Sequence, residues 1–260
     1  MRILLSALAA LALAACDRAR DTASAQEAPP PPPCSSATFE DTPLTHCIAD
    51  PAQHTVRVVL GPEDGSPYRS LSELAVGMGE KASRVAFAVN GGMFDADGMP
   101  IGYYVEDSNR RHTLNRNEGW GNFHLQPNGV FYGSDGKWAV RASDDFAAHV
   151  KKRPEFGTQS GPMLVIDGKL HPRFDADGPS RKLRNGVGVD KHGRAHFVIS
   201  EAPISFGKFA RYFRDELNTP NALFLDGSVS SLWDPNTGRV DGGPPLGPLI
   251  VVEKRHKAKP

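Results

Sequence analysis

The sequence predicts an α+β domain built around a largely antiparallel or mixed sheet with a few helices. Glycine and proline are abundant, at 26 and 22 residues, and they separate short apolar runs as frequent turns would. Most of these runs have the length and alternation of strands, and three segments have helical spacing. Strands, a helix and more strands follow one another without regular βαβ alternation, which favours this class over a parallel α/β fold.

The first half of the domain is predicted as strands around one helix. His54–Leu60 alternates like a half-buried strand. Ser70–Met78 has helical spacing behind a serine, a residue type preferred at the N-cap. Arg84–Val89 is typical of a buried strand and leads directly into Asn90-Gly91-Gly92. Ile101–Glu106 is predicted as a further strand.

The middle of the chain adds a meander and two helices. Asn122–Arg141 contains turn signals at Pro127-Asn128-Gly129 and at Ser134-Asp135-Gly136. Ser143 is expected to open a short helix, and Ser205 a longer one. The longer helix has an apolar stripe that predicts core packing and comprises Phe206, Phe209, Phe213 and Leu217.

The last part is predicted to consist of hairpins and one apolar strand. Asp167-Gly168 and His192-Gly193 are hairpin turns, and the second joins Gly186–Val189 to Ala195–Ile199. Ala222–Leu225 is an apolar strand that is followed directly by Asp226 and Gly227. We find no second linker within residues 34–255, which have the length of one domain.

The N-terminus has the features of an export signal. Met1-Arg2 supplies positive charge, Ile3–Ala15 is an apolar run too short to span a membrane, and Cys16 follows small residues. This arrangement resembles the lipobox of bacterial lipoproteins, which predicts a signal peptide over residues 1–15 and a lipid on Cys16. The alternative is ordinary secretion with Cys16 as an unpaired thiol. On either interpretation, we expect the protein to be located in the bacterial cell envelope. If Cys16 carries a lipid, we expect the protein to be anchored on the periplasmic side of the membrane.

Residues 16–33 are predicted to be a tether. They are rich in alanine and end in the prolines 29–33, which favour an extended polyproline spacer. Cys34 and Cys47 follow, and in an oxidising compartment two thiols so close in sequence predict a disulfide. Acidic and basic residues balance at 30 each, so no overall charge attracts nucleic acid.

Several enzyme classes lose support because their motifs are missing. The sequence has no histidine pair at metal spacing, no phosphate-binding loop and no Gly-x-Ser-x-Gly elbow. Ser205-x-x-Lys208 matches one element of penicillin-binding serine enzymes, but the companion motifs are absent and Ser205 serves equally as a helix cap. We expect neither a metal nor another cofactor.

Polar residues beside glycines gather at four predicted strand ends, where a backbone can approach a ligand closely. Each cluster alone has a structural explanation as a turn or a surface ion pair, but four in one domain indicate a binding site. The clusters are Asn90-Gly91-Gly92-Met93-Phe94-Asp95, Gln159-Ser160-Gly161-Pro162, Arg184-Asn185-Gly186-Val187-Gly188 and Leu225-Asp226-Gly227-Ser228-Val229-Ser230-Ser231.

In this order the clusters resemble those of the phosphodiester glycosidase family, in its bacterial branch. Family members have Asn-Gly-Gly, Thr-Gly-Pro or Ser-Gly-Pro, an arginine before an apolar-glycine strand, and Leu-Asp-Gly-Gly-Gly-Ser. The resemblance extends from about Arg84 to Trp233 and departs from the family pattern at Ser228-Val229, where a glycine run is expected.

The resemblance implies cleavage of the bond between an anomeric carbon and a phosphate. A phosphate monoester, with its second pKa near 6, leaves without a strong acid. Asp226 would then act as nucleophile, base or stabiliser of the charged sugar, with Asp95 and Glu106 as further carboxylates, and Arg184 would bind phosphate. The remaining expected contacts are backbone donors at Gly91, Gly92 and Gly161, with Asn90, Gln159, Ser160, Asn185, Gly227, Ser228 and Ser230 around the sugar.

The same residues would also suit a protein that binds glycan without cleaving it. On either interpretation the partner is a sugar-phosphate or glycan. The two interpretations differ in Asp226, since a binding protein keeps its affinity when that carboxylate is replaced and an enzyme loses turnover.

Overall fold

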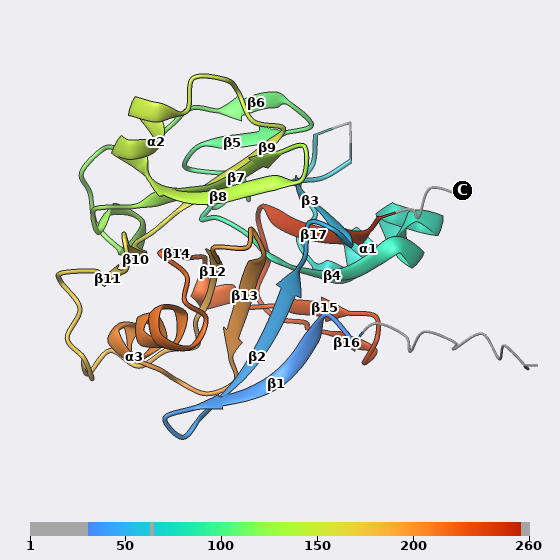
Figure 1. Ribbon diagram of the computed structural model, residues 1–260. Coiled ribbons are helices and arrows are strands. Elements are labelled where there is room, and N and C mark those ends of the chain that lie inside the picture. Colours follow the sequence, from blue (N-terminus) through green and yellow to red (C-terminus); the bar gives the residue numbers. More distant parts are fainter. Residues whose placement is uncertain (1–30, 63–64, 256–260) are drawn as a thin grey trace, which may run out of the picture. The chain divides into compact units, whose positions relative to one another are not determined.

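We analysed a computed structural model of the chain, and the structure describes residues 31–62 and 65–255 (Figure 1). The predicted signal peptide, Cys16 and most of the predicted tether lie outside the described residues. Within them, no helix is long and apolar enough to cross a membrane.

The strands form three sheets in which every pairing is antiparallel. The first sheet has, in spatial order, β1 (Cys34–Phe39), β2 (Thr42–Ala49), β13 (Ala195–Ser200), β12 (Asn185–Val189), β14 (Asn221–Phe224), β10 (Met163–Ile166) and β11 (Lys169–Leu170). The second has β16 (Arg239–Val240), β15 (Leu232–Asp234), β4 (Val85–Asn90), β17 (Leu249–Lys254) and β3 (His54–Val59). The third has β6 (Asn109–His112), β5 (Tyr104–Glu106), β9 (Phe156–Ser160), β7 (Gly129–Ser134) and β8 (Lys137–Ala142).

The three sheets share a central apolar core. Phe197 of the first sheet contacts Phe87 of the second and Phe131 of the third, with ring centroids 5.4 and 5.7 Å apart. The alternation of side chains along each strand directs one face of every sheet into this core. The opposite faces need other partners.

One helix covers the outer face of each sheet (Figure 1). Helix α1 (Leu71–Met78) packs on the second sheet, α2 (Ser143–His149) on the third, and α3 (Phe206–Arg211) on the first. Helix α3 continues as the π-helical turn η3 (Tyr212–Glu216). The predicted α+β class with an antiparallel sheet and a few helices is therefore confirmed, with three sheets in place of one.

At two of the three predicted helix starts, the serine caps the helix with its side chain. Ser70 and Ser205 cap α1 and α3, since their hydroxyl oxygens accept from the backbone N–H groups of Glu73 and Lys208. Ser143 does begin α2, but its hydroxyl donates to Asn128 Oδ1 at 2.6 Å, so it does not cap the helix.

Two predicted strands are shorter than expected. The segment Ile101–Glu106 is extended only from Tyr104, because Ile101 closes back on Met93 through a backbone hydrogen bond. The meander begins at Gly129 and is preceded by the 3-10 turn η2 (Asn122–His124). The predicted disulfide is present and joins Cys34 to Cys47, which face each other across β1 and β2.

Candidate active site

The candidate site lies where the first residue of β12 is next to the last residue of β14. These two strands are antiparallel neighbours, with Gly186 paired to Phe224. The pairing extends one step beyond the strands, since Leu225 N donates to Asn185 O at 3.0 Å. Continuing the register brings Arg184 and Asp226 to adjacent chain ends, and neighbouring strands lie about 4.8 Å apart.

Alternation separates the side chains at this edge into two groups. The side chains of Arg184 and Phe224 face α3. The Arg184 guanidinium lies 3.4 Å from the ring centroid of Phe206 in α3 and 5.6 Å from the ring centroid of Phe224. Asp226 lies two residues beyond Phe224, after β14 has ended, and its carboxylate accepts from Ser228. Asn185 and Leu225 point to the other face, toward the central core.

Asn90, at the end of β4, ties the site together from inside. Its amide nitrogen donates to Asp226 O at 2.8 Å, and its amide oxygen accepts from Asn185 Nδ2 at 2.8 Å and from Ser231 N at 3.0 Å. The side chain is buried and these three hydrogen bonds lie within the protein, and its assignment to orienting a sugar stays a prediction. Asn90 positions the backbone of Asp226, and Ser231, the last residue of the fourth predicted cluster, bonds to the same amide.

The Asp226 carboxylate is partly exposed and begins a tight turn. Its Oδ1 accepts from both the backbone N–H and the hydroxyl of Ser228, as the cap of the 3-10 turn η4 (Gly227–Val229). Ser228 is exposed, whereas Val229 is buried against the cluster below α1. This packing accounts for a valine where the family pattern has glycine. Ser230 bonds back to the turn, with its hydroxyl donating to Gly227 O.

Arg184 is a buried cation with no carboxylate partner among the described residues. It is 1% exposed, and it donates from Nε to Ile204 O and from Nη2 to Ser180 O, both at 2.9 Å. Burial lowers the pKa of Arg184 to about 10, so it stays protonated at neutral pH. An unpaired buried charge is costly, and an anion bound beside it would remove much of that cost.

The N–H groups of Gly91 and Gly92 are not available to a phosphate, contrary to expectation. Gly91 N donates to Pro248 O at 2.7 Å, and Gly92 N donates to Thr158 Oγ1 at 3.2 Å. A side chain at Gly92 would come within 2.3 Å of Gln159 O. Gly92 is therefore required for close packing against β9, whereas a Cβ at Gly91 would lie 3.0 Å from Pro248 O, just before β17.

Gln159 is also fully used within the protein, so the expectation that it orients a sugar hydroxyl is wrong. Its Oε1 accepts from Tyr103 N and Asn115 N, and its Nε2 donates to Asn115 O and Ser143 Oγ. This buried amide fixes the loop that contains Asn115. Gly161 packs on that same loop, because a Cβ there would lie 2.8 Å from Phe123 O.

Two buried polar atoms near the strand ends have no hydrogen-bond partner among the described residues. They are Asn185 Oδ1 and Ser160 Oγ. Both residues lie near the end of β14. Leu225 N donates to the backbone oxygen of Asn185, and Phe224 N donates to Pro162 O, two residues after Ser160. Gly227 completes this edge, and a Cβ there would lie 2.9 Å from Leu183 O.

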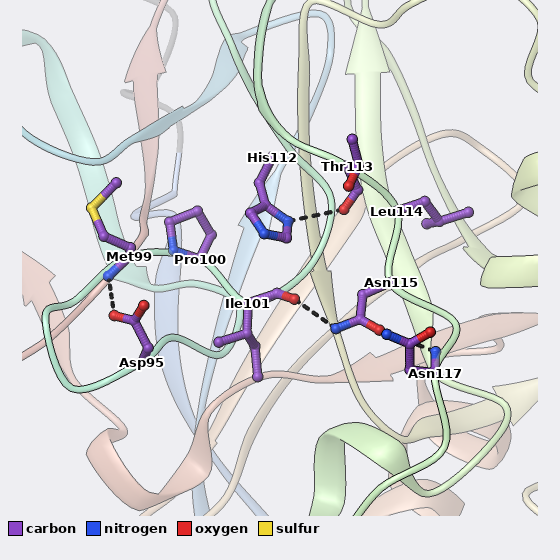
Figure 2. Close-up of a pocket in the computed structure, with 9 residues that line it drawn as sticks. All are labelled: Asp95, Met99, Pro100, Ile101, His112, Thr113, Leu114, Asn115 and Asn117. Carbon is purple, nitrogen blue, oxygen red and sulfur yellow. Dashed lines mark hydrogen bonds between the residues drawn. The ribbon is translucent and has the colours of Figure 1, made fainter.

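Asp95 lines a cavity of about 430 Å³ (Figure 2). Its Oδ1 accepts from Asp97 N and Met99 N, which holds a turn. Across the cavity lies the segment from His112 to Asn117, and Asn115 Nδ2 donates to Ile101 O at 2.8 Å. Asp95 thus belongs to a pocket wall, as Figure 2 shows, and does not face Asp226 in the turn.

Two further expectations are settled by hydrogen bonds elsewhere. Glu106 is paired with Arg111 and accepts from Tyr104, at the opposite end of β9 from Ser160, so it is excluded as the second carboxylate. Lys208 Nζ donates to Glu40 O at 2.6 Å and so does not activate Ser205, which excludes the penicillin-binding arrangement.

Residues 83–243 match the family model described as phosphodiester glycosidase. The match covers most of the described residues, from the start of β4 to beyond β16. The chain belongs to the phosphodiester glycosidase family. Its Asn90, Arg184 and Asp226 clusters all lie inside the matched region.

Relatives of this chain include the uncharacterized protein YigE of Escherichia coli K12, 35% identical over 184 residues, or 71% of each chain. The catalytic domain of zebrafish N-acetylglucosamine-1-phosphodiester alpha-N-acetylglucosaminidase has a TM-score of 0.58 at 16% identity, with 85% of this chain and 82% of that chain covered. A Synechocystis protein has a TM-score of 0.55 at 17% identity, with 85% and 61% covered. At these identities the two structures establish the fold.

Proposed function

We propose that this protein hydrolyses sugar-1-phosphodiesters, with Arg184 binding the phosphate and Asp226 serving the sugar. The observation that carries the proposal is the buried, unpaired Arg184 guanidinium at the chain end beside Asp226. The name of the zebrafish protein, whose fold this chain shares, describes a reaction of the same class.

The surroundings of Arg184 favour an anionic ligand. Ser180 O, which accepts from the guanidinium, belongs to the exposed segment 179–183. Arg181 and Lys182 in that segment are exposed and form no ion pair with described residues. Positive charge at the rim attracts anions, and a planar guanidinium below it can hold phosphate with two parallel hydrogen bonds.

The chemistry needs few groups. The bond between the anomeric carbon and the phosphate oxygen breaks, and the phosphate monoester leaves with the electron pair. A water oxygen joins the anomeric carbon, and that water releases one proton to the solvent. Positive charge that develops on the sugar ring is stabilised by a carboxylate, and Asp226 is the carboxylate at this edge. Asn90 and Ser228 hold Asp226 in place from its backbone and side chain.

The test is to incubate the purified protein with methyl phosphodiesters of glucose 1-phosphate and N-acetylglucosamine 1-phosphate and to measure free sugar. Asp226→Asn should lower kcat by about 100-fold or more, the range of a lost carboxylate catalyst, with little change in substrate affinity. Retained turnover in Asp226→Asn would overturn the role of Asp226. Binding without turnover in the unmodified protein would favour the glycan-binding alternative.

Arg184→Lys tests the phosphate contact. This substitution keeps the positive charge, which Arg184→Ala would remove. Lysine lacks the planar fork, so kcat/KM should fall about tenfold or more for phosphodiesters, and less for uncharged p-nitrophenyl glycosides. Arg214→Lys is the matched control, because Arg214 pairs with its neighbour Asp215 on the outside of η3. An equal loss on both substrate types, at unchanged melting temperature, would contradict phosphate binding.

We also propose that the protein is exported and lipid-anchored through Cys16 in the bacterial envelope. The order of charge, apolar run and cysteine at the N-terminus supports this. The disulfide between Cys34 and Cys47 is consistent with an oxidising compartment.

A further inference from the structure

The loop that follows the pocket of Figure 2 is closed at its base. His124 Nδ1 donates to Asn117 O at 2.8 Å, which joins the two ends of residues 117–124. Gly119 packs against the His124 ring, since a Cβ there would lie 2.8 Å from ring atoms. The base of the loop is therefore held in place by these contacts, and residues 119–121 form its tip.

Trp120 stands at the tip of this loop and is 98% exposed. The other two tryptophans, Trp138 and Trp233, are each 7% exposed. The flanking residues from Asn117 to Asn122 are polar or glycine, so the indole is isolated and not part of an apolar patch. An exposed indole on a braced, polar loop offers a flat apolar surface to a ligand that is otherwise polar.

The pocket beneath this loop offers hydrogen-bonding groups with free capacity. Only Oδ1 of Asp95 is occupied by the turn, and His112 bonds through Nδ1 alone, to Thr113 O. The Asn117 side-chain amide bonds to no described residue. Carboxylate, imidazole and amide groups around a cavity of about 430 Å³ suit a hydroxyl-rich ligand.

The same loop packs against the end of β9 and the residue that follows it. Its Asn122 and Phe123 carbonyls lie against Gly161, within 3.3 and 2.8 Å of where a Cβ would be. Asn115 bonds to Gln159, the residue before Ser160. The loop is therefore braced against the segment that leads into Pro162, whose carbonyl accepts from Phe224 N in β14.

We propose that this pocket and Trp120 form a glycan subsite, which binds a pyranose ring beyond the cleaved linkage. The indole stacks on the C–H face of the ring, and Asp95, His112 and Asn117 bond its hydroxyls. This inference rests on the proposed function for its link to phosphodiesters. It assigns the substrate to oligosaccharide phosphodiesters, because a single sugar on phosphate would leave the pocket empty.

The test uses neutral tetrasaccharides, which carry no phosphate and so report on the subsite apart from hydrolysis. We would add chitotetraose, maltotetraose or cellotetraose to the full protein and record tryptophan fluorescence with acrylamide quenching. At least one sugar should shift the emission to the blue and protect it from the quencher, because Trp120 is the exposed indole and the other two are buried.

Three variants locate the effect. Trp120→Ala should weaken tetrasaccharide binding, measured by calorimetry, by about tenfold, while Trp120→Phe keeps a ring and should lose less. Asn117→Ala should also weaken binding. Binding unchanged in Trp120→Ala, or a blue shift with phosphatidylglycerol vesicles and with none of the sugars, would overturn the subsite. Sugar binding at Trp120 without any phosphodiester hydrolysis would leave the subsite standing and remove the proposed enzyme.

Discussion

Gly92 illustrates how single residues around the site serve packing before chemistry. The sequence placed Gly91 and Gly92 beside a ligand, but both N–H groups bond within the protein. A Cβ at position 92 would lie 2.3 Å from Gln159 O and 2.5 Å from Thr158 Oγ1. Since Gln159 O is backbone in a central strand of the third sheet, it has little freedom to move away.

Gly92→Ala should therefore lower the free energy of unfolding by about 1–3 kcal/mol, the usual cost of overpacking. Urea unfolding followed by circular dichroism measures the change. Gly242→Ala is the matched control, because a Cβ at Gly242 has nothing within 4 Å, and it should stay within about 0.5 kcal/mol. A Gly92→Ala protein as stable as the control would show that the two sheets separate easily at this point.

At the scale of elements, the pairing of β12 with β14 was predictable and decided where the site would be. Both strands are apolar. Because β14 ends two residues before Asp226 and β12 begins directly after Arg184, adjacency of the strands brings the two chain segments together. The cap signals of Ser70 and Ser205 were equally local and correct. Predictions of this kind depend on a few neighbouring residues.

Other parts of the site could not be predicted, because their contacts are distant in sequence. Asn90 bonds Ser231 and Asp226, and nothing in the pattern of Asn90-Gly91-Gly92 indicates which chain segments fill its hydrogen bonds. Gln159 is an equally polar residue whose partners lie 16–56 residues away. The division into three sheets depends likewise on long-range register, as in the pairing of β4 with β17.

Strands β2 and β13 also bring together a chain of titratable groups outside the site. His46 Nε2 lies 2.9 Å from His196 Nδ1, and His196 Nε2 lies 3.2 Å from Asp190 Oδ2, which also binds Arg194. The two imidazoles stack, with centroids 5.1 Å apart. Burial is the main reason that the pKa of His46 falls to about 4, and the nearby His196 and Arg194 lower it further.

This pKa predicts a loss of stability in acid. The unfolded chain binds a proton at His46 near pH 6.5 and the folded chain only near pH 4, so between these values the unfolded state holds more protons. The free energy of unfolding should therefore fall as the pH falls from 6.5 to 4, by on the order of 3 kcal/mol from this group. Burial lowers the pKa of His196 in the same direction.

His46→Gln removes the titrating group, so its stability should depend less on pH across that window. His149→Gln, on the outside of α2, is the control and should keep the slope of the unmodified protein. Urea unfolding at several pH values gives the comparison. An identical slope in His46→Gln and the unmodified protein would rule out His46 as the source.

At the scale of the whole molecule, three sheets share one core and each outer face is covered by a helix, so the apolar surface is largely used internally. The sequence has equal numbers of acidic and basic residues, 30 each. Without an overall charge, attachment to an anionic membrane surface requires a specific anchor. The cysteine that follows the apolar N-terminal run is the residue suited to provide it.

Cys16 should carry the lipid, because Leu13-Ala14-Ala15 ahead of it provides the small-residue cleavage site and Ile3–Ala15 the apolar region of an export signal. Cells that produce the protein should incorporate a palmitate analogue into it, and Cys16→Ala should abolish labelling and release the protein from the membrane fraction. One acyl chain binds membranes only marginally, whereas two or more anchor a protein stably, so release should be nearly complete. Cys34→Ala with Cys47→Ala is the control, since it removes the disulfide but leaves the anchor, and labelling should persist. A mature N-terminus upstream or well downstream of Cys16, determined by mass spectrometry, would show that this cysteine is not the anchor.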